Sequence, residues 1–87
     1  MELETYIEKY LGTLYLQHRS KMRGPVNEEE LVARVKEGVA EDTGVELAID
    51  DVRTLIDEHV SASWRKLSPT EADAQWLREV RRKEGTP

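Results

Sequence analysis

Cysteine and phenylalanine are absent from this chain of 87 residues. Without cysteine the protein cannot contain a disulfide, a thiolate-ligated metal or a cysteine nucleophile. Long apolar runs are absent too, since none approaches the ~20 residues that a membrane-spanning helix needs. The N-terminus also lacks the charged and apolar segments of a secretion signal. We therefore expect a cytoplasmic protein that has no membrane partner.

Histidine is scarce, with His18 and His59 the two examples. They fall on different predicted helices, and the sequence holds no HExxH, GxSxG or glycine-rich phosphate-binding motif. The acidic pair Asp50 and Asp51 lacks the alternating oxygen ligands and central glycine of a calcium loop. We expect no catalytic residue, no metal site and no cofactor, and hence a protein that is not an enzyme. His59 lies on an apolar stripe, which predicts a core or interface residue.

Apolar residues are few for so short a chain: 38% of the residues are hydrophobic and 36% are charged. A domain of this size buries only about 60–65% of the surface of its unfolded chain, and such domains commonly need a further source of stability. Disulfides are excluded, which leaves well-capped helices and association between chains. We therefore expect a homodimer or a complex with a permanent partner.

The apolar residues recur at helical spacing, and they predict an all-α fold, a small bundle of four helices. The first predicted helix covers the first 20 residues, with Leu3, Ile7 and Leu14 on one face. Further tyrosines and leucines widen this face beyond what a monomer of this size could comfortably bury. Gly12 either marks the close approach of another backbone or is a tolerated glycine in an ordinary core helix.

Polar residues at the starts of the second and fourth predicted helices have clear capping chemistry. Asn27 can accept a hydrogen bond from the free N–H groups of the second helix, and Glu30 can complete a capping box. Gly44 is expected to end that helix. Ser68 and Glu71 give the same pattern before the fourth helix. The buried face of the fourth helix is expected to consist of Ala72, Trp76, Leu77 and Val80.

The region between these two helices has a weaker pattern. Residues 45–49 alternate between apolar and polar, which predicts a short strand or an extended connector. Asp50 is expected to cap a third helix that extends to Leu67. The second and third helices could then form a helix-turn-helix-like unit in the middle of the chain. We expect one helical domain over residues 1–83 and a frayed tail over residues 84–87.

Charge is unevenly distributed along the chain, whose net charge is −5. Residues 27–63 carry eleven acidic and three basic side chains, a net charge of −8, whereas residues 1–26 and 64–87 carry +1 and +2. Two basic clusters lie in these flanks: Arg19, Lys21 and Arg23, and Arg78, Arg81, Arg82 and Lys83. We expect them to contact a nucleic acid or an acidic partner, or to pair with the acidic centre.

Tyrosine and tryptophan are enriched in protein interfaces, and Leu14 lies on the apolar face of the first predicted helix. The candidates for a partner or dimer contact are Tyr6, Tyr10, Leu14, Tyr15 and Trp64. They predict a small non-enzymatic protein–protein interaction module that acts through an apolar helix face. An adaptor, an antitoxin-like protein, an anti-factor or a phage accessory protein would fit. The alternative is a DNA-binding accessory protein or transcriptional regulator that uses the basic clusters, although a net charge of −5 disfavours DNA.

Overall fold

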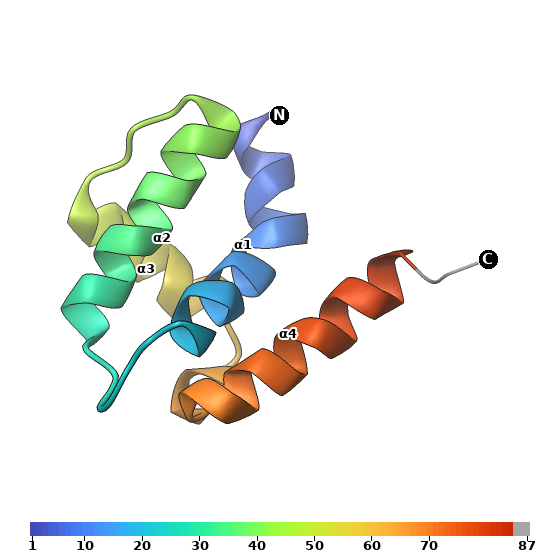
Figure 1. Cartoon of the computed structure of the whole chain (residues 1–87). Helices are drawn as coiled ribbons and strands as arrows, with labels where there is room; N and C mark the ends of the chain where they lie inside the picture. Colours follow the sequence, from blue (N-terminus) through green and yellow to red (C-terminus); the bar gives the residue numbers. More distant parts are fainter. Residues whose placement is uncertain (85–87) are drawn as a thin grey trace.

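Four α-helices and one short 3₁₀-helix make up the protein in the computed structural model, which describes residues 1–84 (Figure 1). The elements are α1 (Leu3–Ser20), α2 (Glu28–Thr43), α3 (Ile49–His59), η1 (Trp64–Lys66) and α4 (Pro69–Glu84). This part of the chain contains no strand, which confirms the all-α prediction, and residues 45–48 are a connector. The predicted tail included Glu84, which belongs to α4; residues 85–87 lie outside the described part.

None of the helices within residues 1–84 combines the length and the apolar character needed to cross a membrane.

Side-chain caps fix the starts of α2 and α4. The Asn27 side chain accepts a hydrogen bond from the Glu30 N–H at 3.2 Å, as predicted, whereas the Glu30 carboxylate, predicted to complete a capping box, accepts from Arg34 at 2.8 Å. At α4 the capping box is complete, because the Ser68 hydroxyl accepts from the Glu71 N–H (3.2 Å) and the Glu71 carboxylate accepts from the Ser68 N–H (3.0 Å). α2 ends at Gly44, whose φ of 77° lies in the left-handed region that glycine adopts without strain.

The start of α3 differs from the prediction by two residues. The helix begins at Ile49, and Ala48 occupies the N-cap position without a side-chain hydrogen bond. Asp50, predicted to be the cap, instead lies in the first turn, where its carboxylate is favourably placed near the positive end of the helix dipole.

The end of α3 is also earlier than predicted. The helix stops at His59 instead of Leu67, and Val60 has an extended backbone. The Ser61 hydroxyl accepts a hydrogen bond from the Ser63 N–H at 3.3 Å, and such local bonds compete with a helix. His59 was predicted to be a core or interface residue; the core alternative is wrong, because its side chain is exposed at the end of α3, and the interface alternative stays a prediction.

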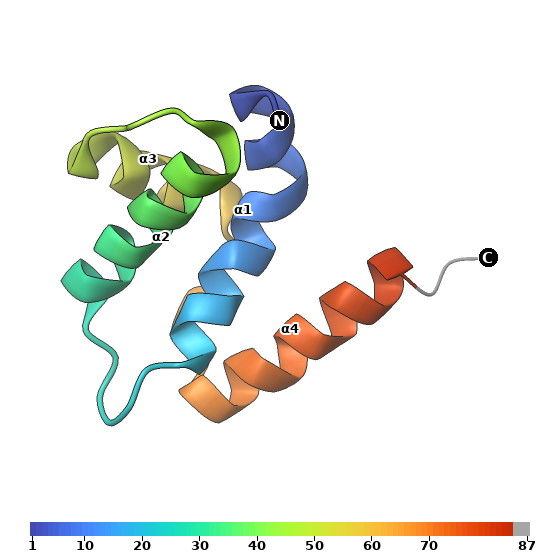
Figure 2. The same ribbon diagram turned by 45° about the horizontal axis from the view of Figure 1, so that its top comes forward.

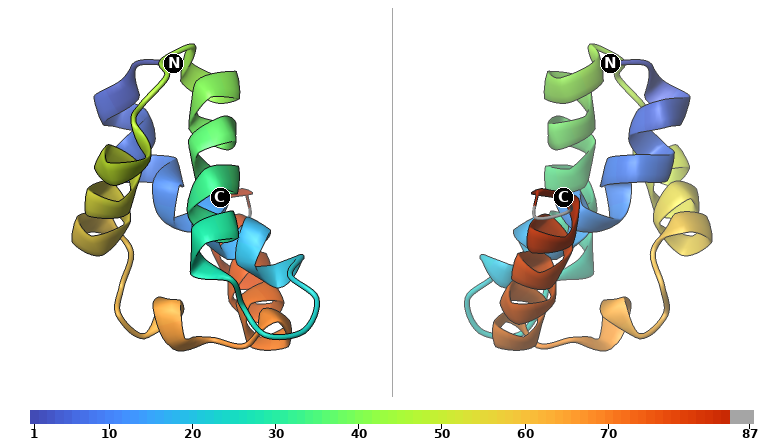
Figure 3. Two further views of the ribbon diagram at one scale, coloured as in Figure 1. Left: turned by 90° about the vertical axis from the view of Figure 1, so that its left-hand side faces the viewer. Right: turned by 90° about the vertical axis from the view of Figure 1, so that its right-hand side faces the viewer.

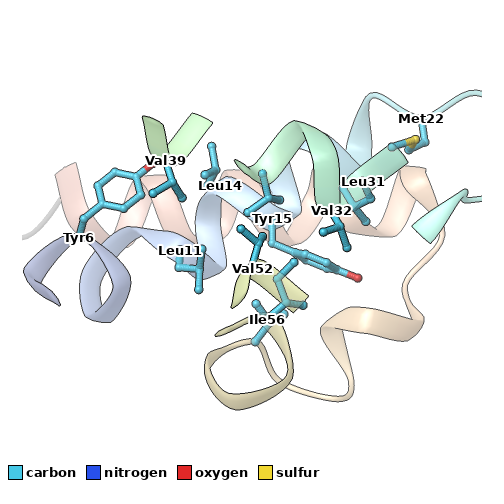
Figure 4. Close-up of a cluster of buried hydrophobic side chains, with 12 residues drawn as sticks. Tyr6, Leu11, Leu14, Tyr15, Met22, Leu31, Val32, Val39, Val52 and Ile56 are labelled. Atoms are coloured by element: carbon cyan, nitrogen blue, oxygen red, sulfur yellow. The ribbon is translucent and has the colours of Figure 1, made fainter. Parts of the chain in front are cut away.

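The core lies between α1, α2 and α3, whose apolar side chains converge in Figure 4. The largest completely buried side chains are Tyr15, Leu11, Leu16, Leu31, Val35, Val39 and Val52. α4 packs against α1, outside this core (Figures 1 and 2). Because α1 contacts each of the other three α-helices, one chain can bury a broad apolar face on this helix without a second copy.

The face of α4 that was predicted to be buried is only partly so. Ala72 is fully buried, Trp76 and Val80 are half-buried, and Leu77 is 40% exposed. The physical reason is that α1 is the principal neighbour of α4. One helix cannot cover the whole apolar surface of α4, so part of that surface remains exposed.

Candidate functional site

An open groove of about 840 Å³ lies between α1 and α4. We call it the α1–α4 groove. Its lining comes from α1, the C-terminal end of α2 and the second half of α4: Tyr6, Glu8, Lys9, Tyr10, Thr13, Leu14, Gln17, Asp42, Trp76, Val80 and Lys83.

Five of the residues that line the groove are apolar or aromatic. Tyr6 and Leu14 of α1 are buried, with 4% and 9% exposure. Trp76 and Val80 of α4 are half-buried, and Tyr10 of α1 is 36% exposed. The lining also contains four exposed charged side chains: Glu8, Lys9, Asp42 and Lys83. A surface that combines apolar and aromatic groups with exposed charges has the usual composition of a protein interface.

Lys83 reaches across the groove from α4 to α1. Its ammonium group donates a hydrogen bond to the backbone carbonyl of Lys9 and lies 4.7 Å from the centroid of the Tyr10 ring. A cation over an aromatic face is attracted by the ring quadrupole, by about 0.5–1 kcal/mol at exposed sites. Since Lys83 is exposed, water or another cation can replace this contact.

A second contact at the same end of the groove joins α1 to the end of α2. The Tyr6 hydroxyl donates a hydrogen bond to the Asp42 carboxylate at 2.6 Å. Burial, with the neighbouring carboxylate, raises the pKa of Tyr6 above its ordinary value of 10, so the hydroxyl remains a donor. The rings of Tyr6 and Tyr10 lie with centroids 5.7 Å apart and planes tilted by 39°. Two aromatic rings therefore lie side by side at this end.

The five interface candidates predicted from the sequence differ in how exposed they are in the structure. Tyr15 is completely buried in the core, and Tyr6 and Leu14 contribute little more than an edge. Trp64 is half-buried and packs against the backbone of α1. Tyr10 is the candidate with substantial exposure, and it lies in the groove. The other four contact their own chain because α2, α3, α4 and η1 surround α1.

Arg19 was expected to contact a nucleic acid or an acidic partner, but the structure places it inside the protein. The side chain is 5% exposed. Its guanidinium donates to the Leu67 carbonyl at 2.6 Å, to the Tyr15 hydroxyl at 3.0 Å and to the Glu28 carboxylate at 3.1 Å. Arg19 therefore joins α1 to the start of α2 and to the residue before the α4 cap. The expectation of a contact with a nucleic acid or an acidic partner is wrong for it, and the alternative, a pair with the acidic centre, is confirmed by its ion pair with Glu28.

The basic residues of α4 also differ from one another. Arg78 and Arg81 are exposed. Arg82 forms an ion pair with Glu79 at 3.1 Å, and Glu79 itself is only 8% exposed. Lys83 is held in the groove. The four basic residues of α4 therefore differ in their contacts within the chain, while all four side chains remain exposed.

The uneven distribution of charge along the sequence is not repeated as a separation in space. The turn that carries Lys21 and Arg23 lies at the same end of the molecule as η1 (Figure 3), and it leads directly into the three glutamates that open α2, Glu28, Glu29 and Glu30. Some flank residues do pair with the acidic centre of their own chain, as Arg65 does with Asp57 at 2.7 Å. The exposed positions of α3 are mainly acidic or uncharged, which is unfavourable for a DNA-reading helix.

Trp76 and Val80 were assigned to the core from the sequence, but they line the groove. The signal that could have identified them is the size of the apolar surface on the fourth helix, which exceeds what one neighbouring helix can cover.

No three histidine, cysteine, aspartate or glutamate side chains among residues 1–84 lie close enough together to hold a metal ion. No protein-family model, curated protein or solved structure matches this chain.

Proposed function

We propose that the protein is a small non-enzymatic binding module whose α1–α4 groove takes an apolar segment of another protein. One observation carries the proposal: exposed Tyr10 and half-buried Trp76 and Val80 line one concave surface together with exposed charged residues. Tyrosine and tryptophan are the residues that most often dominate binding energy at interfaces. An amphipathic segment laid between two helices buries such a surface.

The concave shape favours a segment of a different chain over a second copy. A two-fold dimer needs one patch that is complementary to itself, and a groove does not fill an identical groove. The homodimer expected from the sequence depended partly on the breadth of the apolar face of α1, which α2, α3 and α4 cover within one chain. The proposed binding therefore does not require a homodimer, and the experiment below tests for one.

The test uses peptides selected from a random displayed library against the wild-type protein. The Kd of the best peptide is then measured by fluorescence anisotropy for two matched variants. Tyr10→Ala removes a side chain that is 36% exposed in the groove, and Leu77→Ala removes one that is 40% exposed on α4 outside the lining. We expect Tyr10→Ala to weaken binding at least about tenfold, as truncation of a central interface residue does, and Leu77→Ala to leave it unchanged.

Equal effects of the two variants, or backbone amide shifts that place the peptide on α3, would overturn the proposal. A species of twice the 10.0 kDa chain mass that Tyr10→Ala dissociates would assign the groove to a second copy. Salt-sensitive binding of duplex DNA that is weakened by Arg78→Gln and Arg81→Gln but not by Tyr10→Ala would favour the DNA-binding alternative.

A further inference from the structure

The Tyr10 end of the α1–α4 groove is occupied by a positive charge from the chain itself. The Lys83 ammonium lies over the Tyr10 ring and donates to the Lys9 carbonyl. We propose that this end of the groove is a binding site for a cationic side chain, a lysine or arginine of the partner segment, which displaces Lys83. The inference rests on the proposed function and names the chemistry of the partner.

The groups at this end favour a cation in three ways. The face of the Tyr10 ring carries negative electrostatic potential. The Lys9 carbonyl is a hydrogen-bond acceptor for an ammonium or guanidinium group. The carboxylates of Glu8 and Asp42 also line the groove and are exposed. Apart from Lys83, the cation in the lining is Lys9, which contributes its carbonyl oxygen to the site.

The Asp42 carboxylate is held in position by a neighbour. It accepts the hydrogen bond from the Tyr6 hydroxyl at 2.6 Å, and Tyr6 is 4% exposed. A buried tyrosine therefore holds an acidic group of α2 in the lining of the groove. A charge fixed in this way attracts a cation without first losing side-chain freedom.

Lys83 is an internal competitor that an incoming side chain can displace. It is exposed, and Lys9, which accepts its hydrogen bond, is 74 residues distant along the chain. Ordering a lysine side chain costs conformational entropy comparable with what one exposed cation–π contact returns. A cationic side chain of the partner segment has apolar neighbours that cover Trp76 and Val80. These contacts already order the segment, so binding the cation requires less additional ordering.

The test uses n-butylammonium as a probe for a lysine side chain and 1-butanol as its uncharged counterpart. Each is titrated at constant ionic strength into the full chain, and the chemical shifts of the Trp76 indole, which also lines the groove, are followed by NMR in the wild type and in every variant. Lys83→Gln removes the competitor. Arg81→Gln is the matched control, because it removes one charge from an exposed position on the same helix outside the lining. Tyr10→Leu keeps an apolar side chain and removes the aromatic face.

We expect Lys83→Gln to tighten butylammonium binding about two- to fivefold, the range of one exposed cation–π contact, while Arg81→Gln leaves it unchanged. Tyr10→Leu should weaken butylammonium binding and leave 1-butanol unaffected. Equal affinities for the two probes in the wild type, or equal effects of Lys83→Gln and Arg81→Gln, would overturn the inference.

Failure of this inference can be told apart from failure of the proposed function. A peptide that binds in the groove with unchanged affinity after all its lysines and arginines are replaced by glutamine would leave the proposed function intact and overturn the cation site. Charge-selective butylammonium binding with no peptide bound in the groove would support the cation site and overturn the proposed protein partner.

Discussion

The indole of Trp64 lies so close to Gly12 that a Cβ built on the glycine would stand 2.9 Å from Cζ3 of the ring. The contact brings η1 against the middle of α1, and Trp64 packs on the edge of the core. The sequence left open whether Gly12 marks the close approach of a backbone or is simply tolerated. The approaching group is a side chain of the same molecule.

Gly12→Ala should destabilise the wild-type protein by about 1 kcal/mol and stabilise the Trp64→Ala variant by a similar amount. Alanine gains about 1 kcal/mol of helix propensity over glycine, but an added carbon in a packed contact costs about 1–3 kcal/mol. Removing the indole leaves only the first effect. Urea unfolding of the four proteins, followed by circular dichroism, measures the coupling. If Gly12→Ala changes the unfolding free energy in the same direction in the wild type and in Trp64→Ala, the packing explanation is refuted.

Arg19→Ala should lower the free energy of unfolding by roughly 2–4 kcal/mol, because it leaves the Tyr15 hydroxyl and the Leu67 carbonyl without their hydrogen-bond donor. Glu28→Gln should cost less than about 1 kcal/mol, since the Glu28 side chain is 56% exposed and its ion pair is largely solvated. Denaturant unfolding of the two variants checks the ranking. Equal losses would mean that the ion pair, and not the buried hydrogen bonds, stabilises this corner.

His18 should make the protein less stable in mild acid. Its Nδ1 atom is buried without a hydrogen-bond partner. Burial, together with Lys21 and Arg34, lowers the pKa of His18 below its ordinary value of 6.5, against the opposing effect of Glu37 and Glu41. The unfolded chain therefore takes up this proton first. Stability is full above pH 6.5 and falls as the pH drops below it, by at most about 1.4 kcal/mol per pH unit.

His18→Gln should flatten this dependence of the unfolding free energy on pH between about 5 and 7. His59→Gln is the matched control, because His59 is exposed and should leave the slope as it is in the wild type. If the two variants have the same slope as the wild type, another group is responsible for the acid sensitivity.

Tyr6→Phe should cost about 1 kcal/mol at neutral pH, the usual contribution of one hydrogen bond, because it removes the bond to Asp42. It should also reduce the loss of stability in alkali. The pKa of Tyr6 is raised by burial and by Asp42, so the unfolded chain releases the proton first, near pH 10, and stability present below that pH is lost above it. Thermal melts between about pH 8 and 11 test both effects.

Tyr15 keeps some alkaline sensitivity in that variant, because burial raises its pKa as well, against the opposing effect of Arg19. Tyr15→Phe is therefore the second arm of the experiment. If both variants lose stability at high pH as the wild type does, the buried tyrosines are not the cause of that loss.

Local chemistry explains why so much of the fold could be predicted. The starts of α2 and α4 depend on side chains within three residues of the cap, and Asn27, Ser68 and Glu71 make those bonds in the structure. The end of α3 was missed because two patterns competed there. An apolar stripe continued past His59, while the serines that follow favoured local hydrogen bonds over another helical turn.

The groove could not be predicted because it depends on which helices become neighbours. Trp76 and Val80 have the spacing of core residues, and only the position of α4 beside α1 leaves them half-buried. Lys83 and Arg81 are both exposed basic residues near the end of one helix, yet only Lys83 lines the groove.

The sequence by itself determined the helices, two of their caps and the uneven charge, because spacing and capping act over a few neighbouring residues. The tertiary structure decided which glycine meets which side chain: Gly12 faces Trp64, and Gly38 faces Leu14, whose Cδ1 would lie 2.9 Å from an added Cβ. It also decided that Arg19 is buried and that Tyr10 remains exposed. Burial is a property of how helices pack on each other, and no single helix contains that information.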